Sequence, residues 1–130
     1  MARVTIVNDS PEFLDLVRDI LEGDRYETVT IDGDRADTLE LIRASRPHLL
    51  MIDIRLGVEG DHGWQIAQEV RRDPSLEELP VLLCSADPSA LAEIEAGLGA
   101  TRSVRTLAKP FSVDRLTSAI DELLADPALH

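Results

Sequence analysis

The sequence predicts an α/β fold of the doubly wound type, with five βα units arranged around one parallel sheet. Short runs rich in Val and Ile recur along the 130 residues, and segments with apolar residues at helical spacing separate them. Parallel strands must be joined by long crossovers, usually helices, so this alternation favours a parallel sheet covered on both faces. The length suits one hydrophobic core, and we expect a single domain over residues 1–130.

The first βα unit has clear boundaries in the sequence. Residues 3–8 are typical of a strand. Ser10 then provides an N-cap and Pro11 a first-turn proline for a helix that ends at Gly23. The apolar residues predicted for one face of this helix are Phe13, Leu14, Leu16, Val17, Ile20 and Leu21.

The second and third units continue the pattern. Residues 26–31 alternate like a strand, and a helix is predicted from Asp34 to just before Pro47. Residues 48–54 are almost continuously apolar except for Asp53, which is typical of a central strand buried on both faces. A Gly-rich loop follows, and a helix is then predicted over residues 64–72.

The last two units complete the chain. Residues 81–85 and 104–108 are predicted strands, and the single cysteine, Cys84, lies in the first of them as an inert buried thiol. Asp87 caps a short helix between these strands, and Ser112 caps the final helix. Its predicted inward residues are Val113, Leu116, Ile120, Leu123 and Leu124. Few residues remain after it, so we expect no attached output domain.

Composition excludes several classes of function. The chain has 13 Lys and Arg residues against 25 Asp and Glu residues, for a formal net charge of −12. Such a charge repels nucleic-acid phosphates and anionic lipid surfaces, so we expect no direct nucleic-acid or membrane binding. There is neither a signal-peptide pattern nor an apolar run long enough to span a bilayer, and the cytoplasm is the expected location.

Polar residues lie at the carboxyl ends of four predicted strands. In an open parallel sheet, ligands bind in the crevice outside these ends. The polar residues placed there are Asn8, Asp9, Asp53, Ser85 and Lys109. We therefore expect four separate segments to converge on one site.

These residue types suit phosphoryl transfer. Asp9 and Asp53 would repel each other without a cation between them, so the pair favours a hard ion such as Mg²⁺. An aspartate can accept a phosphoryl group covalently, and Asp53 is the best-placed acceptor. Lys109 and the Ser85 hydroxyl could then bind the phosphoryl oxygens.

Four short segments in order carry a resemblance to a known family. Residues 7–9 read Val-Asn-Asp, residues 51–54 Met-Ile-Asp-Ile, residues 83–86 Leu-Cys-Ser-Ala and residues 108–111 Ala-Lys-Pro-Phe. Together they lie at the carboxyl ends of four of the predicted strands, and the whole chain resembles the receiver domains of response regulators in two-component signalling.

The resemblance implies a fold and a mechanism. The fold would be flavodoxin-like, with strand order 2-1-3-4-5, and the peptide bond before Pro110 would be cis. A histidine kinase or phosphotransfer protein would phosphorylate Asp53, with Mg²⁺ held by Asp9, Asp53 and the backbone carbonyl of Arg55. Such a domain is a switch rather than an enzyme, although receivers catalyse their own phosphorylation and dephosphorylation. It would act through a separate downstream protein, as chemotaxis-type regulators or phosphorelay intermediates do.

The sequence departs from this family at two positions and is unusual at two more. Asn8 stands where the family has an acidic residue, so Mg²⁺ should bind more weakly, with Asn8 contacting it through a water. Thr106 stands where the family has a switch aromatic, so the usual coupling cannot operate. Arg55 and Asp87 occupy positions that face the phosphoryl group, and an ion pair between them would change the phosphate lifetime.

Three other functions compete with the phosphorylation switch. A haloacid-dehalogenase phosphatase needs a second aspartate two residues after the nucleophile, where this chain has Arg55. A flavodoxin needs a Ser/Thr- and Gly-rich phosphate loop, which is absent after the first strand. The serious alternative is a degenerate receiver that binds a protein partner without control by phosphorylation.

Overall fold

One parallel sheet with helices on both faces makes up the fold. The computed structural model describes residues 2–33, 37–54, 62–87, 89–93 and 104–125. Its strands and helices are β1 (Arg3–Asn8), α1 (Pro11–Gly23), β2 (Glu27–Asp32), α2 (Thr38–Ser45), β3 (Leu49–Asp53), α3 (His62–Arg72), β4 (Val81–Ser85), β5 (Val104–Ala108) and α5 (Val113–Ala125). The five strands lie in the order β2-β1-β3-β4-β5 and every neighbouring pair is parallel. The predicted fold class and strand order are confirmed.

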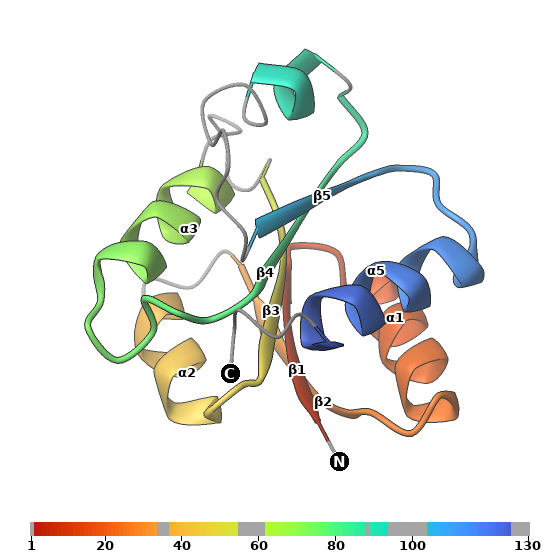
Figure 1. The fold of residues 1–130 in the computed structure, drawn as a ribbon, viewed down its shortest axis with the longest axis horizontal. Helices are drawn as coiled ribbons and strands as arrows, with labels where there is room; N and C mark the ends of the chain where they lie inside the picture. The colour runs from red at the N-terminus through yellow and green to blue at the C-terminus, as the bar shows by residue number, and fades with distance from the viewer. Residues whose placement is uncertain (1, 34–36, 55–61, 88, 94–103, 126–130) are drawn as a thin grey trace.

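The two faces of the sheet carry different helices. Figure 1 shows α1 and α5 on one side of the strands and α2 and α3 on the other. Residues 89–93 are also helical and follow β4. Two of these helices, α1 and α5, matter most for the site, because they cover the face toward which Asp53 points.

Alternation along the strands divides the core into two clusters. In β1, Val4 and Ile6 pack with α1 and α5, whereas Val7 packs with α2 and α3. In β3, Leu49 and Met51 belong to the α1/α5 cluster, whereas Leu50 and Ile52 belong to the other. Successive strand side chains point to opposite faces, so a central strand must be apolar at nearly every position.

The element boundaries follow the sequence closely. β1, β4 and β5 have the predicted bounds, and α1 begins after Ser10, whose Oγ accepts the N–H of Phe13 at 3.3 Å. α3 begins two residues before the predicted start, at His62. α2 begins at Thr38; Asp34, where its start was predicted, lies outside the described residues.

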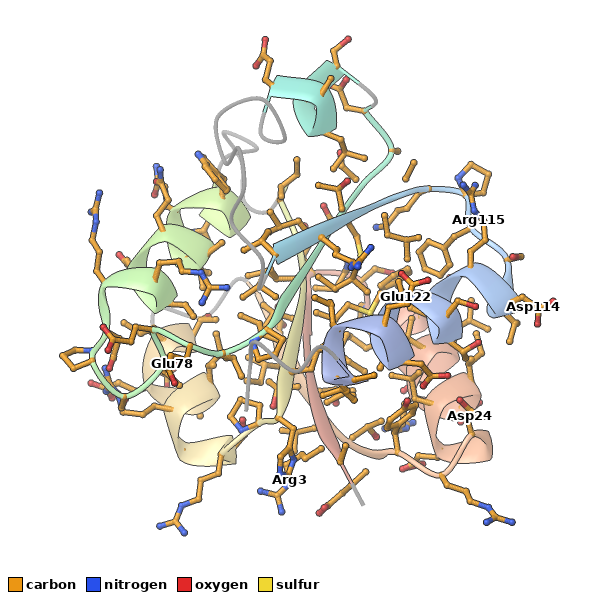
Figure 2. All side chains as sticks on the ribbon, viewed as in Figure 1. Arg3, Asp24, Glu78, Asp114, Arg115 and Glu122 are labelled. Atoms are coloured by element: carbon orange, nitrogen blue, oxygen red, sulfur yellow. The ribbon has the colours of Figure 1, made fainter. Side chains whose placement is uncertain are left out.

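Two residues predicted to face the core are exposed instead. Leu16 is 58% exposed and Val113 is 53% exposed. Helical residues are about 100° apart, so Leu16 lies roughly on the opposite side of α1 from the buried Leu14. Val113 is the first residue of α5, and Figure 2 shows the next two residues, Asp114 and Arg115, at the outer end of this helix. Both predictions were wrong because apolar character alone did not define the buried face.

None of the helices in the described part of the chain has the length and apolar composition needed to cross a bilayer.

Candidate functional site

Strand parity brings three of the predicted residues to one face of the sheet. Asn8 follows Ile6 by two residues and Asp53 follows Met51 by two, so both share the side of the α1/α5 cluster. Lys109 stands in the same relation to Leu107, just after β5. All the strands are parallel, so these positions meet at the carboxyl edge of the sheet.

The Asp53 carboxylate is held between two donors. Its Oδ2 accepts a hydrogen bond from Asn8 Nδ2 at 3.3 Å and forms an ion pair with Lys109 Nζ. The Asp53 side chain is only 12% exposed, so the lysine charge neutralises a carboxylate that is largely removed from water. The structure thus gives Asp53 a fixed orientation and a cation beside it.

The backbone around Lys109 is tied to the neighbouring strand. The Lys109 N–H donates to the Ser85 carbonyl at 2.8 Å, which continues the pairing of β5 with β4. The peptide bond from Lys109 to Pro110 is cis, as the resemblance implied.

Asn8 acts as a hydrogen-bond donor toward Asp53. Its Oδ1 accepts the backbone N–H of Ser10 at 2.8 Å, which assigns the amide oxygen to the turn and the NH₂ group to Asp53. The residue is 2% exposed. Where an acidic residue would repel Asp53, Asn8 therefore stabilises the carboxylate. Its water-mediated contact with a metal stays a prediction.

Asp9 is exposed beside an acidic hollow. A hollow of about 240 Å³ at the ends of β1 and β2 has three carboxylates in its lining, those of Asp9, Asp15 and Asp32. Among the described residues no group of three or more His, Cys, Asp or Glu side chains could hold a metal. Mg²⁺ commonly binds one or two protein carboxylates and retains several waters, so the chemistry of Asp9 and Asp53 is compatible with that ion, and their joint role as ligands stays a prediction. Arg55, the third predicted ligand, lies outside the described residues.

Ser85 and Asp87 form a turn at the end of β4. Ser85 is fully buried, and its Oγ accepts the Asp87 N–H at 3.0 Å. Asp87 Oδ1 accepts the N–H groups of Ser89 at 3.0 Å and Ala90 at 3.2 Å, so Asp87 caps the helical residues 89–93 as predicted. The predicted ion pair with Arg55 falls partly outside the described residues.

Thr106 lies in β5 opposite Leu83 of β4 and is half-buried. The role in switching that the resemblance assigned to this position stays a prediction.

The thiol of Cys84 is close to the site but unreactive. Cys84 is opposite Asp53 in the β3–β4 register and is 1% exposed. Burial raises the pKa of this thiol to about 12; the Lys109 charge acts to lower it and the Asp53 charge to raise it. The group stays protonated near neutral pH, which supports the prediction of an inert thiol.

Sequence reasoning missed two residues that shape the site. Gly63, near the start of α3, lies against the backbone of Asp53: a Cβ at Gly63 would be 1.8 Å from the Asp53 carbonyl oxygen. Phe13 was predicted only as a core residue, but its ring lies 4.2 Å from Lys109 Nζ. A glycine at the start of a helix was a weak signal for the first, and no sequence signal indicated the second.

Comparison with known proteins decides the family. The family model of the response regulator receiver domain matches residues 4–121. The chain belongs to this family. The receiver domain is 31% identical over 124 residues to the polar-differentiation response regulator DivK of Brucella anthropi, covering 95% of this chain and 96% of DivK.

A sensor histidine kinase and a solved receiver domain are also similar to this chain. The receiver domain is 31% identical over 124 residues to the sensor histidine kinase TmoS of Ectopseudomonas mendocina, covering 95% of this chain but 12% of the kinase. The solved receiver domain of a sensor histidine kinase from Pseudomonas aeruginosa PAO1 superposes with a TM-score of 0.78 at 20% identity, covering 96% of this chain and 98% of that one. That structure has a magnesium ion coordinated in its active-site cleft. Receiver domains are switches of two-component signalling rather than classical enzymes.

Proposed function

We propose that this receiver domain is a phosphorylation switch in which Asp53 accepts a phosphoryl group from a histidine kinase or a phosphotransfer protein. The observation that carries this proposal is the arrangement of Asp53 at the end of the central strand, with the Lys109 ammonium on its carboxylate. Phosphoryl transfer depends mainly on positioning and charge neutralisation, and this arrangement supplies both.

The transfer itself needs little acid–base chemistry from the protein. A carboxylate oxygen of Asp53 attacks the phosphorus of a phosphohistidine, the P–N bond breaks, and its electron pair stays on the imidazole nitrogen. Lys109 remains beside the attacked carboxylate and neutralises charge on the phosphoryl oxygens. The Ser85 hydroxyl accepts a hydrogen bond from Asp87, so its own proton can be directed to one of those oxygens.

A magnesium ion fits this chemistry. The carboxylates of Asp9 and Asp53, with the carbonyl of Arg55, would hold Mg²⁺, which when bound neutralises phosphoryl oxygens. The magnesium ion in the receiver domain from Pseudomonas aeruginosa supports this assignment. Asn8 offers an N–H group to Asp53 where an acid would add a negative charge, so the ion should bind more weakly than in a receiver with two adjacent acids.

The output of the switch would pass to a separate protein in the cytoplasm. Phosphorylation adds about −1.5 to −2 charges at Asp53. The segment from Ser85 through Asp87 to the helical residues 89–93 is hydrogen-bonded in series, so recruiting the Ser85 hydroxyl would shift that segment. Thr106 and Arg55 would modify this response or the phosphate lifetime. We also propose that residues 1–130 act as one domain. This domain would make no direct contact with nucleic acid.

Acetyl phosphate with Mg²⁺ tests the proposal by intact mass. The wild-type protein should gain the mass of one phosphoryl group, and Asp53→Asn should gain none. Asp19→Asn changes an exposed carboxylate of α1 and serves as the matched control, which should behave like wild type. A folded wild-type protein that gains no mass would instead favour the degenerate receiver, a binding module not controlled by phosphorylation.

A further inference from the structure

The Lys109 ammonium contacts an aromatic ring as well as Asp53. Its Nζ lies 4.2 Å from the centroid of Phe13, over the ring, and forms an ion pair with Asp53 Oδ2. A cation within about 6 Å of a ring centroid is attracted by the negative charge of the ring face. The head group of Lys109 is therefore held from two sides.

The turn between β1 and α1 fixes the position of Phe13. Asn8 Oδ1 accepts the Ser10 N–H at 2.8 Å, and Ser10 Oγ accepts the Phe13 N–H at 3.3 Å. These bonds join the end of β1 to the first turn of α1. Because Asn8 also donates to Asp53, one residue ties the backbone of Phe13 to the carboxylate.

A second aromatic ring ties Phe13 to the segment that carries Lys109. The rings of Phe13 and Phe111 pack edge to face, with centroids 6.1 Å apart and an interplanar angle of 80°. Phe111 follows Lys109 by two residues, immediately after Pro110. The ring under the ammonium is thus supported both from its own helix and from the lysine segment.

We infer that Phe13 is a positioning residue for Lys109. Its ring face keeps the ammonium where the oxygens of a phosphoryl group on Asp53 would lie. A lysine head group sits on a flexible four-carbon stem, so a fixed ring limits the positions that it samples before the phosphoryl group arrives. This inference rests on the proposed phosphorylation of Asp53, and Phe13 acts only through Lys109.

Packing is the competing explanation for any effect of Phe13. The side chain also packs against the α1/α5 core cluster. Phe13→Leu keeps an apolar side chain but removes the aromatic face, whereas Phe13→Tyr keeps both. Val17→Ala is the matched control, because Val17 is fully buried in the same helix and cluster and its truncation loosens the packing there without removing the ring.

The first measurement is the rate of phosphoryl uptake from acetyl phosphate in a double-mutant cycle. Phe13→Leu should slow uptake roughly three- to tenfold, the factor expected for loss of one cation–π contact. Phe13→Tyr should restore the rate, and Phe13→Leu should have no further effect in a Lys109→Gln background. The inference is overturned if Phe13→Leu slows uptake equally in both backgrounds, or if Val17→Ala slows it as much.

The second measurement does not depend on phosphorylation. Protons on the Lys109 side chain near the ammonium should show an upfield ring-current shift in NMR spectra, lost in Phe13→Leu and kept in Phe13→Tyr. Phosphoryl uptake without this shift would overturn the inference alone. A wild-type protein that shows the shift but takes up no phosphoryl group would overturn the proposed function and, with it, the role inferred for Phe13.

Discussion

Gly63 lies directly against the backbone carbonyl of Asp53. A Cβ placed on Gly63 would be 1.8 Å from that oxygen and 2.8 Å from the carbonyl carbon. The next residue, Trp64, donates its N–H to the Ile54 carbonyl at 3.3 Å. The start of α3 is therefore in contact with the strand end that carries the proposed phosphoacceptor.

Replacing Gly63 should disturb this strand end. Gly63→Ala should lower the free energy of unfolding by about 1–3 kcal/mol through overpacking, and should also slow phosphorylation because the Asp53 backbone must shift. Gly23→Ala is the control, since nothing lies within 4 Å of a Cβ at Gly23. Urea unfolding and phosphoryl uptake would measure both effects. Equal behaviour of the two variants would show that the contact does not constrain Asp53.

Asn8→Asp should strengthen magnesium binding. The change replaces an N–H donor to Asp53 with a carboxylate, so the site gains a negative charge that only a cation can offset. We expect the Mg²⁺ dissociation constant to fall about tenfold, as one added charge near the ion implies, and the metal-free protein to lose stability. Titration followed by Trp64 fluorescence would measure the affinity. Gln68→Glu, an equal change on α3, should leave it unaltered; an unchanged affinity in Asn8→Asp would contradict the expectation.

Asp73 should make stability depend on pH in the acid range. Hydrogen bonds from the Ser75 hydroxyl, from Arg43 and from the Ser75 N–H lower the pKa of Asp73 to about 2. The unfolded value is near 3.9, so the stabilisation is complete above about pH 4 and is lost as the pH falls toward 2.

The substitution Asp73→Asn tests this dependence. It should destabilise the protein at neutral pH, and its difference from wild type should shrink as urea midpoints are measured from pH 7 down to pH 3. Asp15→Asn breaks an exposed pair with Arg18 and should have little effect at any pH. A difference between Asp73→Asn and wild type that stayed constant with pH would rule out the proposed linkage.

Cys84 should resist alkylation in the folded protein. With the pKa of its thiol raised to about 12 and 1% of the residue exposed, almost no accessible thiolate exists near pH 8. Iodoacetamide should therefore modify the native protein far more slowly than the urea-unfolded protein, as followed by mass spectrometry. Equal rates in the two states would contradict the buried position.

The fold was largely predictable because each local signal agreed with the others. The apolar run interrupted by Asp53 identified the central strand, and Ser10 with Pro11 marked the start of α1. The polar residues at strand ends could be named because a parallel sheet brings such ends together. Asn8, Asp53 and Lys109 do meet at one edge.

Details of the site depended on contacts between distant segments. The contact of Phe13 with Lys109 joins residues 96 positions apart, and its existence depends on how α1 docks on the sheet. The close approach of Gly63 to Asp53 likewise depends on how the start of α3 packs against the end of β3. Leu16 was misplaced because an apolar residue can remain on the outer face of a helix without a large cost.

Reductive trapping of the phosphorylated protein tests the central claim most directly. Borohydride reduces an aspartyl phosphate to homoserine with release of phosphate, so peptide mapping after treatment with acetyl phosphate and Mg²⁺ locates the modified residue. We predict homoserine at position 53 and at no other carboxylate. Homoserine at another position, or none in a protein that is folded and supplied with Mg²⁺, would contradict Asp53 as the phosphoacceptor.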